Sequence, residues 1–199
     1  MTLGTKDVFR TLGASNHTKS ERAKNDFYAT NPKAIDLLLG VETFNHRILE
    51  PACGMGHLSK RLEKFGHKVF SYDLVDRGYG KAPYDFLERT KPFNGDIITN
   101  PPYNLALEFI QKSLELIPTG NKAAFYLKVQ FLEGKERRVF FEKSPPKTIY
   151  VFSGRMGCGK DGVFPSPRGA IAYSWWVWEK GYTGDPPHQV DKLRTIKEV

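Results

Sequence analysis

Apolar and polar residues alternate along residues 26–180 in a pattern that predicts strands and helices following one another. Side chains that recur on one face at a helical period predict helices over residues 33–39, 57–65, 105–117 and 132–142. Runs of branched and aromatic residues predict strands over residues 46–50, 68–72, 93–99, 122–129, 148–152 and 169–179. The strand, turn, helix and strand over residues 46–72 have the size of a parallel crossover, which predicts an α/β domain.

Asparagine, proline and glycine mark the ends of two of the predicted helices. Asn31 is a predicted helix cap, Pro32 suits the first helical turn, and Gly40 ends the same helix. Asn104 is the predicted cap of the helix over residues 105–117. These residues therefore fix where each helix is expected to begin or end.

The segments between the periodic stretches predict loops and flexible ends. Residues 73–85 are too few for a helical crossover, so we expect a loop there, with a short strand or turn at residues 84–87. Residues 153–168 are rich in glycine and proline and predict a long mobile loop. Residues 1–25 predict a flexible basic arm and residues 181–199 a polar tail. A single domain is expected between the arm and the tail.

The composition adds a class of partner and a compartment. Lys and Arg exceed Asp and Glu by 30 to 22, so the formal net charge is +8 and the isoelectric point is about 9.4. This surplus favours a polyanionic partner, nucleic acid first, although a basic protein without such a partner has the same composition. No apolar run reaches the roughly 20 residues of a membrane span, and no signal peptide is evident. Cys53 and Cys158 form no metal-binding pattern, so we expect a cytoplasmic, reduced protein without a metal or a membrane partner.

A glycine-rich turn follows the predicted strand over residues 46–50. It reads Glu50-Pro51-Ala52-Cys53-Gly54-Met55-Gly56. Gly54 and Gly56 let the backbone approach a ligand closely, which suits a nucleoside or an amino-acid tail. Glu50 is a predicted acceptor for an ammonium or amide group and would repel a pyrophosphate. Asp73 follows about twenty residues later, where an acidic side chain binds ribose hydroxyls in nucleoside-binding sheets.

A second stretch combines a buried strand with an unusual turn. Ile97 and Ile98 predict the strand, and Asn100-Pro101-Pro102-Tyr103 follows it directly. Because proline lacks an N–H and restricts the residue before it, the strand is expected to end at Asn100. The amide, the backbone carbonyls and the ring suit a flat ligand that bears an amino group. A proline turn with a packed tyrosine is the structural alternative.

Taken in order, these motifs resemble those of the S-adenosylmethionine-dependent amino-methyltransferases, most closely the small phage-type N6-adenine DNA methyltransferases. The resemblance covers about residues 26–179 and implies a Rossmann-like fold, with a mostly parallel central sheet, helices on both faces and an antiparallel last strand. It implies S-adenosylmethionine as the cofactor, bound by Phe27, Tyr28, Thr30, Glu50, Pro51, Ala52, Gly54, Gly56, Asp73, Asp85, Phe86 and Asn100. Within this set, Asp73 is expected to bind the ribose, and Asp85 with Phe86 to hold the adenine ring. The catalytic residues would be Asn100, Pro101, Pro102 and Tyr103.

The resemblance also implies direct methyl transfer to the exocyclic amine of adenine. The Asn100 side chain and the Pro101 carbonyl would accept hydrogen bonds from the two N–H groups of the amine. These bonds would aim the lone pair of the nitrogen at the methyl group. Tyr103 would stack on the target base after the base leaves the duplex. Neither a covalent enzyme intermediate nor a metal is required.

We expect no separate target-recognition domain in this sequence. Contacts with DNA are therefore expected from the basic arm and from Arg137, Arg138, Arg155, Lys160 and Arg168. A solvated helix face is the alternative for Arg137 and Arg138. The same tetrad also fits adenine in RNA or a protein glutamine amide as substrate, and a cofactor-binding module without catalysis is a further alternative.

Overall fold

Six strands form the central sheet of the computed structural model, which describes residues 28–154, 156, 158–160 and 171–185. They are β2 Arg47–Glu50, β3 Lys68–Ser71, β4 Asp96–Thr99, β5 Lys122–Lys128, β6 Thr148–Val151 and β8 Tyr173–Glu179. Their order across the sheet is β3-β2-β4-β5-β8-β6. Strand β2 is parallel to β3 and β4, and β4 is parallel to β5, whereas β8 is antiparallel to β5 and β6. The predicted mostly parallel sheet with an antiparallel last strand is confirmed.

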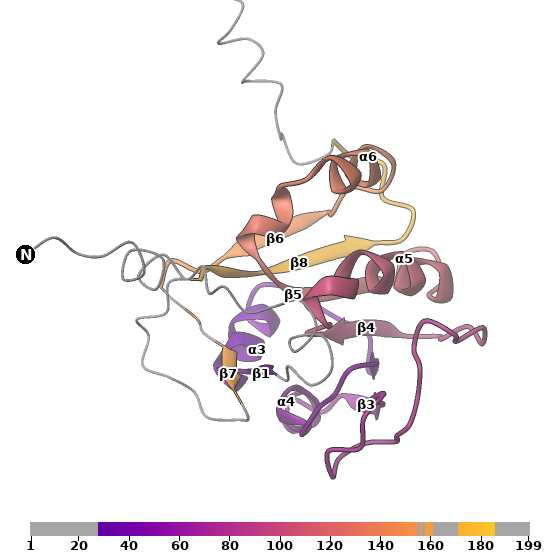
Figure 1. The fold of residues 1–199 in the computed structure, drawn as a ribbon, viewed down its shortest axis with the longest axis vertical. Coiled ribbons are helices and arrows are strands. Elements are labelled where there is room, and N and C mark those ends of the chain that lie inside the picture. Colours follow the sequence, from indigo (N-terminus) through magenta and orange to yellow (C-terminus); the bar gives the residue numbers. More distant parts are fainter. Residues whose placement is uncertain (1–27, 155, 157, 161–170, 186–199) are drawn as a thin grey trace, which may run out of the picture.

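Helices cover both faces of this sheet, as predicted (Figure 1). They are α3 Pro32–Leu39, α4 His57–Lys64, α5 Ala106–Leu116 and α6 Lys135–Lys143. The first two helices share one apolar cluster, and the last two share the other. Strand β8 contributes to both clusters because its side chains alternate between the faces: Trp175 packs into the cluster with α3 and α4, and Trp176 into the cluster with α5 and α6.

Helix α3 begins where its cap was predicted. The Asn31 side chain accepts a hydrogen bond from Lys33 N at 3.0 Å, Pro32 occupies the first turn, and Gly40 is the C-terminal cap. Because the cap satisfies an N–H group that has no partner inside the helix, Asn31→Ala is expected to lower the free energy of unfolding by about 1 kcal/mol. Urea unfolding followed by circular dichroism measures this loss. Asn31→Ser keeps a capping oxygen and should lose less, and equal losses in both variants would contradict the capping role.

Two predicted boundaries are wrong, for reasons that lie outside the local sequence. Strand β4 begins at Asp96 and not at Phe93, because its pairing with β2 starts there and Asp96 binds two other segments of the chain. Its carboxylate accepts hydrogen bonds from Asn45 N at 2.6 Å and from Lys122 N at 2.8 Å. Asn104 does not cap the following helix. It lies inside a 3-10 turn, Tyr103–Leu105, in which Leu105 N donates to the Pro102 carbonyl, and α5 begins only at Ala106.

Two other elements are also shifted from their predicted positions. Helix α6 begins at Lys135, because the 3-10 turn Val129–Leu132 first carries the chain away from β5. Part of the predicted loop over residues 153–168 is a strand, β7 Cys158–Lys160, which pairs antiparallel with β1 Tyr28–Thr30. Local composition cannot reveal this pairing, because its two strands lie more than a hundred residues apart in sequence.

The loop over residues 73–85 is confirmed, since no helix forms there. A bridge between Tyr72 and Lys81 closes it beside β3. The turn expected at residues 84–87 lies two residues later, because Arg89 N donates to the Phe86 carbonyl at 3.1 Å. No helix within the described residues is long and apolar enough to span a membrane. Phe27, Arg155, Arg168 and the predicted arm lie outside the described residues.

Candidate active site

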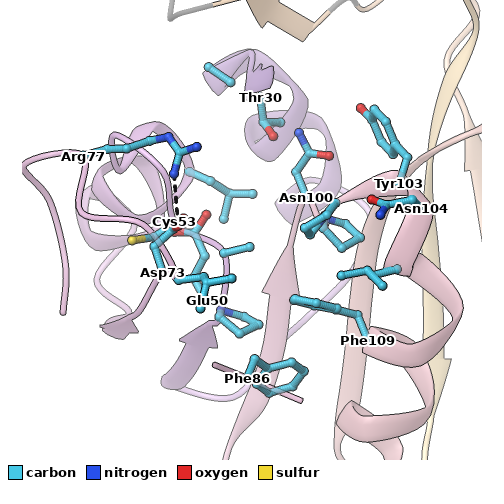
Figure 2. Close-up of a pocket in the computed structure, with 18 of the residues that line it drawn as sticks. Thr30, Glu50, Cys53, Asp73, Arg77, Phe86, Asn100, Tyr103, Asn104 and Phe109 are labelled. Carbon is cyan, nitrogen blue, oxygen red and sulfur yellow. Dashed lines mark hydrogen bonds and ion pairs between the residues drawn. The ribbon is translucent and has the colours of Figure 1, made fainter. Parts of the chain in front are cut away.

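A cavity of about 760 Å³ opens at the carboxyl ends of the parallel strands. Ligands of open α/β sheets bind at this edge, because the loops that leave the strands converge there. The cavity is lined by most of the predicted site residues, namely Thr30, Glu50, Pro51, Ala52, Asp73, Asp85, Phe86, Asn100, Pro101, Pro102 and Tyr103. Figure 2 shows Glu50 and Asp73 on one side of the cavity, and Asn100 and Tyr103 on the other. The structure therefore brings the two predicted motifs together.

The glycine-rich turn joins β2 to α4. Gly54 and Gly56 both have positive φ angles, of 54° and 76°, a conformation that favours glycine. Gly56 also has no space for a side chain, because a Cβ atom there would lie 2.2 Å from the Tyr79 ring. Neither glycine lines the cavity itself. In the structure the two glycines shape the turn that carries Pro51, Ala52 and Cys53 to the cavity wall, and their predicted contact with a ligand stays a prediction.

Glu50 is buried at the end of β2, although it carries an ionisable group. Its carboxylate accepts a hydrogen bond from Ser59 Oγ, and Ser59 Oγ lies 2.6 Å from Ser71 Oγ. Burial raises the pKa of Glu50 well above its ordinary value, and the hydrogen bond from Ser59 offsets this only in part. In the protein alone, Glu50 therefore holds a proton at a pH where an exposed glutamate has lost it.

The raised pKa of Glu50 makes stability depend on pH. The folded state keeps the Glu50 proton above the unfolded pKa of about 4.3, so the unfolded state binds fewer protons and stability falls as pH rises. The stability stops falling once the pH passes the pKa of Glu50 in the folded state. Because Glu50→Gln has no such proton, its free energy of unfolding should rise relative to wild type from about pH 4 upward. Urea unfolding between about pH 4 and 8 measures this difference. The exposed Glu88→Gln is the control, and a pH-independent difference for Glu50→Gln would contradict the assignment.

Asp73 follows β3 and holds the glycine-rich turn in place. Its Oδ2 accepts a hydrogen bond from Gly54 N at 2.7 Å, and its Oδ1 accepts one from Val75 N at 2.9 Å. Arg77 forms an ion pair with the same Oδ1 at 3.2 Å, drawn as a dashed line in Figure 2. A carboxylate has about four acceptor positions, so Asp73 keeps acceptor capacity toward the cavity. The side chain is thus both a structural link and a candidate ligand for hydroxyl groups.

Asp85 and Phe86 line the cavity from the turn that follows the 73–85 loop. Phe86 is buried and packs against Phe109 of α5, with ring centroids 5.0 Å apart. Asp85 Oδ1 accepts a hydrogen bond from Leu87 N at 2.9 Å, which fixes the turn. An aromatic ring beside a fixed carboxylate suits a flat heterocycle that bears an amino group.

The tetrad leaves the end of β4 and turns directly into the cavity. Strand β4 ends at Thr99, one residue before Asn100, as the two prolines predicted. Tyr103 begins the 3-10 turn, and its ring lies 6.1 Å from that of Tyr173. Lys128 Nζ lies 4.7 Å from the centroid of the Tyr103 ring. This end of the cavity therefore combines aromatic rings with the Asn100 amide and the Lys128 ammonium group.

Cys53 lies within the turn and also lines the cavity. Burial raises the pKa of the Cys53 thiol to about 12, and the nearby Glu50 contributes to the rise. Because the thiolate is the nucleophilic form, this thiol is unreactive at neutral pH. Among the residues that the structure describes, no group of His, Cys, Asp and Glu side chains could hold a metal ion.

Four of the remaining predicted residues lie in helices or strands of the described structure. Arg137 and Arg138 belong to α6 and do not line the cavity. Arg137 packs over the Phe131 ring at 5.0 Å, and Arg138 forms an exposed ion pair with Glu142 at 3.1 Å. Tyr28 and Lys160 lie in β1 and β7, which pair with each other.

Sequence reasoning missed several residues that line the cavity, among them His57, Arg77, Lys128 and Tyr173. His57 starts α4 directly after the glycine-rich turn, and Arg77 follows Asp73 by four residues, so both were close to predicted motifs. Lys128 ends β5 and Tyr173 begins β8, and the two are paired in the antiparallel register. The predicted antiparallel last strand was the feature of the sequence that could have pointed to Lys128 and Tyr173.

No protein-family profile and no curated protein matches this chain in sequence. Solved structures match it in fold. A protein described as an RNA methyltransferase from Pyrococcus horikoshii has a TM-score of 0.54 at 16% identity, with 89% of this chain and 99% of that one covered. A class I S-adenosylmethionine-dependent methyltransferase from Listeria monocytogenes has a TM-score of 0.53 at 16% identity, covering 93% and 70%.

A third similar structure is a modification subunit of a type I restriction enzyme from Vibrio vulnificus. Its TM-score is 0.53 at 15% identity, and this chain spans 51% of its length. The chain has the Rossmann-like fold of class I methyltransferases. S-adenosylmethionine is therefore the cofactor expected for this fold. Because one fold serves many reactions, the substrate has to be inferred from the residues of the site.

Proposed function

We propose that this protein transfers a methyl group from S-adenosylmethionine to the exocyclic amine of adenine in DNA. The observation that carries the proposal is the shared cavity of Asn100-Pro101-Pro102-Tyr103 and the residues around Glu50 and Asp73. Direct transfer needs the amine and the methyl donor in one enclosed site, at short distance and in fixed orientation. The net charge of +8 supports a nucleic acid as the partner.

The residues on the Glu50 side of the cavity fit the chemistry of this cofactor. Asp73 keeps about one acceptor position for a ribose hydroxyl, and Phe86 has a ring for the adenine, whose amine can donate to Asp85. Glu50 can accept a hydrogen bond from the ammonium group, and this contact would favour its charged form. Thr30 also lines the cavity, and Phe27 and Tyr28 are further proposed contacts of the cofactor. When bound, the cofactor supplies an electrophilic methyl group on a sulfonium.

The tetrad binds and orients the amine. Adenine's exocyclic nitrogen is a poor nucleophile because its lone pair is delocalised into the ring. Asn100 Oδ1 and the Pro101 carbonyl accept hydrogen bonds from its two N–H groups. These hydrogen bonds favour tetrahedral nitrogen and stabilise the positive charge that develops there. Tyr103 stacks on the base once it has left the duplex, which contributes about 1–3 kcal/mol. Pro102 keeps the turn rigid, because its ring fixes φ.

The decisive experiment offers three substrates to the same preparation. Transfer from radiolabelled S-adenosylmethionine is measured with duplex DNA, structured RNA and a protein that presents a glutamine side chain. We expect label in DNA as N6-methyladenine, identified by mass spectrometry of the digested nucleosides. Label in RNA alone or in protein alone would assign the site to that substrate. Cofactor binding with no transfer to any of the three would indicate a module without catalysis.

We also propose that Arg137 and Arg138 of α6 contact DNA phosphates. Replacing both with glutamine is expected to weaken duplex binding and to reduce the slope of log K against log salt concentration by about 0.9 for each phosphate that is no longer neutralised. Fluorescence anisotropy between about 50 and 200 mM salt measures both effects. The double variant Lys33→Gln with Lys64→Gln removes the same charge from exposed positions on α3 and α4. An equal change of slope in both double variants would mean that Arg137 and Arg138 belong to a solvated helix face and do not contact DNA.

A further inference from the structure

Lys128 occupies a position in the cavity that none of the proposed roles uses. It ends β5, which lies beside β4 and therefore beside the tetrad. In the antiparallel register it is opposite Tyr173, the first residue of β8. Both side chains line the cavity, and Lys128 Nζ lies 4.7 Å from the centroid of the Tyr103 ring.

The charges around the cavity are divided unequally between its two ends. Asp73, Arg77 and Asp85 all come from the segment that follows β3, and the protonated Glu50 ends the neighbouring β2. Within that group Asp73 and Arg77 already form an ion pair. Among the described residues that line the tetrad end, Lys128 is the one with a full charge. An anion would therefore meet a cation at the tetrad end of the cavity.

An ammonium group over an aromatic ring is held by the electrons of the ring face, but it remains a strong donor to an anion. Its four-carbon stem is flexible, so Nζ can move from the ring to a group nearby. A nucleotide whose base stacks on Tyr103 carries phosphates on both sides of its sugar. A glutamine side chain on the same ring brings no anion.

We infer that Lys128 binds a backbone phosphate next to the target nucleotide, and so selects a phosphodiester substrate over a protein amide. The inference rests on the proposed function of the tetrad. It assigns Lys128 a positioning role: the ammonium fixes the sugar-phosphate backbone while Tyr103 holds the base. Discrimination against protein amides then follows from the charge of the substrate and not from the shape of the tetrad, which both substrates fit.

The test combines enzyme variants with substrates in which one phosphate is neutral. A short duplex that the wild-type protein methylates is prepared with a methylphosphonate in place of either phosphate that flanks the target adenine. Lys128→Gln, Lys128→Arg and Lys64→Gln are compared with wild type. The last removes one exposed charge on α4, away from the cavity. KM and kcat are measured on each substrate, and duplex binding is measured over a range of salt concentrations.

Lys128→Gln is expected to raise KM about tenfold, as the loss of one charged hydrogen bond does, with kcat changed less than about threefold. Its salt slope for duplex binding should fall by about 0.9, the value for one phosphate contact. Lys128→Arg keeps the charge and should restore most of the affinity. One of the two methylphosphonates should raise the wild-type KM by a similar factor and have no further effect on Lys128→Gln, because each change removes the same interaction.

Two results would overturn the inference while the proposed function stands. One is that the effect of Lys128→Gln on KM adds to the effect of each of the two methylphosphonates. The other is a fall in kcat with an unchanged KM and salt slope, which would mean that Lys128 only supports the Tyr103 ring. The proposed function fails separately if the wild-type protein methylates no DNA. If the wild-type protein methylates RNA only, the same cycle on RNA still tests the phosphate contact. If it methylates protein only, both proposals are wrong.

Discussion

Asn100→Ala is expected to lower the rate of methyl transfer by a factor of about 100 or more and to leave cofactor affinity largely unchanged. The loss of one fixed hydrogen-bonding group that stabilises developing charge costs about 10²–10³ in rate. Asn100 lies at the end of β4, on the opposite side of the cavity from Glu50 and Asp73, so the main cofactor contacts remain (Figure 2). Single-turnover transfer and calorimetric titration with S-adenosylmethionine measure the two quantities separately.

Two further variants show whether the acceptor oxygen of Asn100 is responsible. Asn100→Asp keeps an acceptor at the same position and should retain more activity than Asn100→Ala. Asn94→Ala removes an exposed asparagine just before the amino end of β4 and should behave as wild type. Wild-type transfer by Asn100→Ala would remove the proposed role of the tetrad. A large loss of cofactor affinity in the same variant would mean that Asn100 acts through the cofactor.

The parts of the site that the sequence predicted are those in which adjacent residues determine the structure. The prolines after Asn100 end β4 whatever surrounds them, because they cannot donate to the sheet. Gly54 and Gly56 form their turn because the backbone there needs positive φ. Parallel strands then place the residues that follow them at one edge of the sheet. Glu50, Asp73 and Asn100 thus meet in one cavity although they lie tens of residues apart in sequence.

The parts that were missed depend on contacts between distant segments. Strand β4 starts where Asp96 binds Asn45 and Lys122, and neither partner is near Asp96 in sequence. The pairing of β1 with β7 likewise joins two segments that are far apart along the chain. Lys128 enters the site only through the register of β5, because one residue of slip would turn its side chain to the other face of the sheet. Such positions follow from the packing of the whole sheet and not from a local pattern.

Asp73→Ala is expected to weaken binding of S-adenosylmethionine by a factor of about 30 or more. The carboxylate is the proposed acceptor for a ribose hydroxyl, and hydrogen bonds to a charged group contribute about 1.5–3 kcal/mol each. The substitution also leaves Gly54 N without its acceptor and Arg77 without its ion pair. Calorimetric titration measures the affinity, and thermal melting without cofactor reports the structural part of the loss.

The separation of these two parts rests on variants that change one interaction at a time. Asp73→Asn keeps an oxygen for Gly54 N but loses the charge, so it should melt closer to wild type than Asp73→Ala while still binding the cofactor weakly. Asp76→Ala removes an exposed carboxylate from the same loop, one that accepts a hydrogen bond from Gly78 N, and should leave affinity unchanged. Wild-type affinity in Asp73→Asn would mean that the charge of Asp73 does not contact the ribose. The carboxylate would then serve to hold the glycine-rich turn, and another group in the cavity would have to bind the sugar.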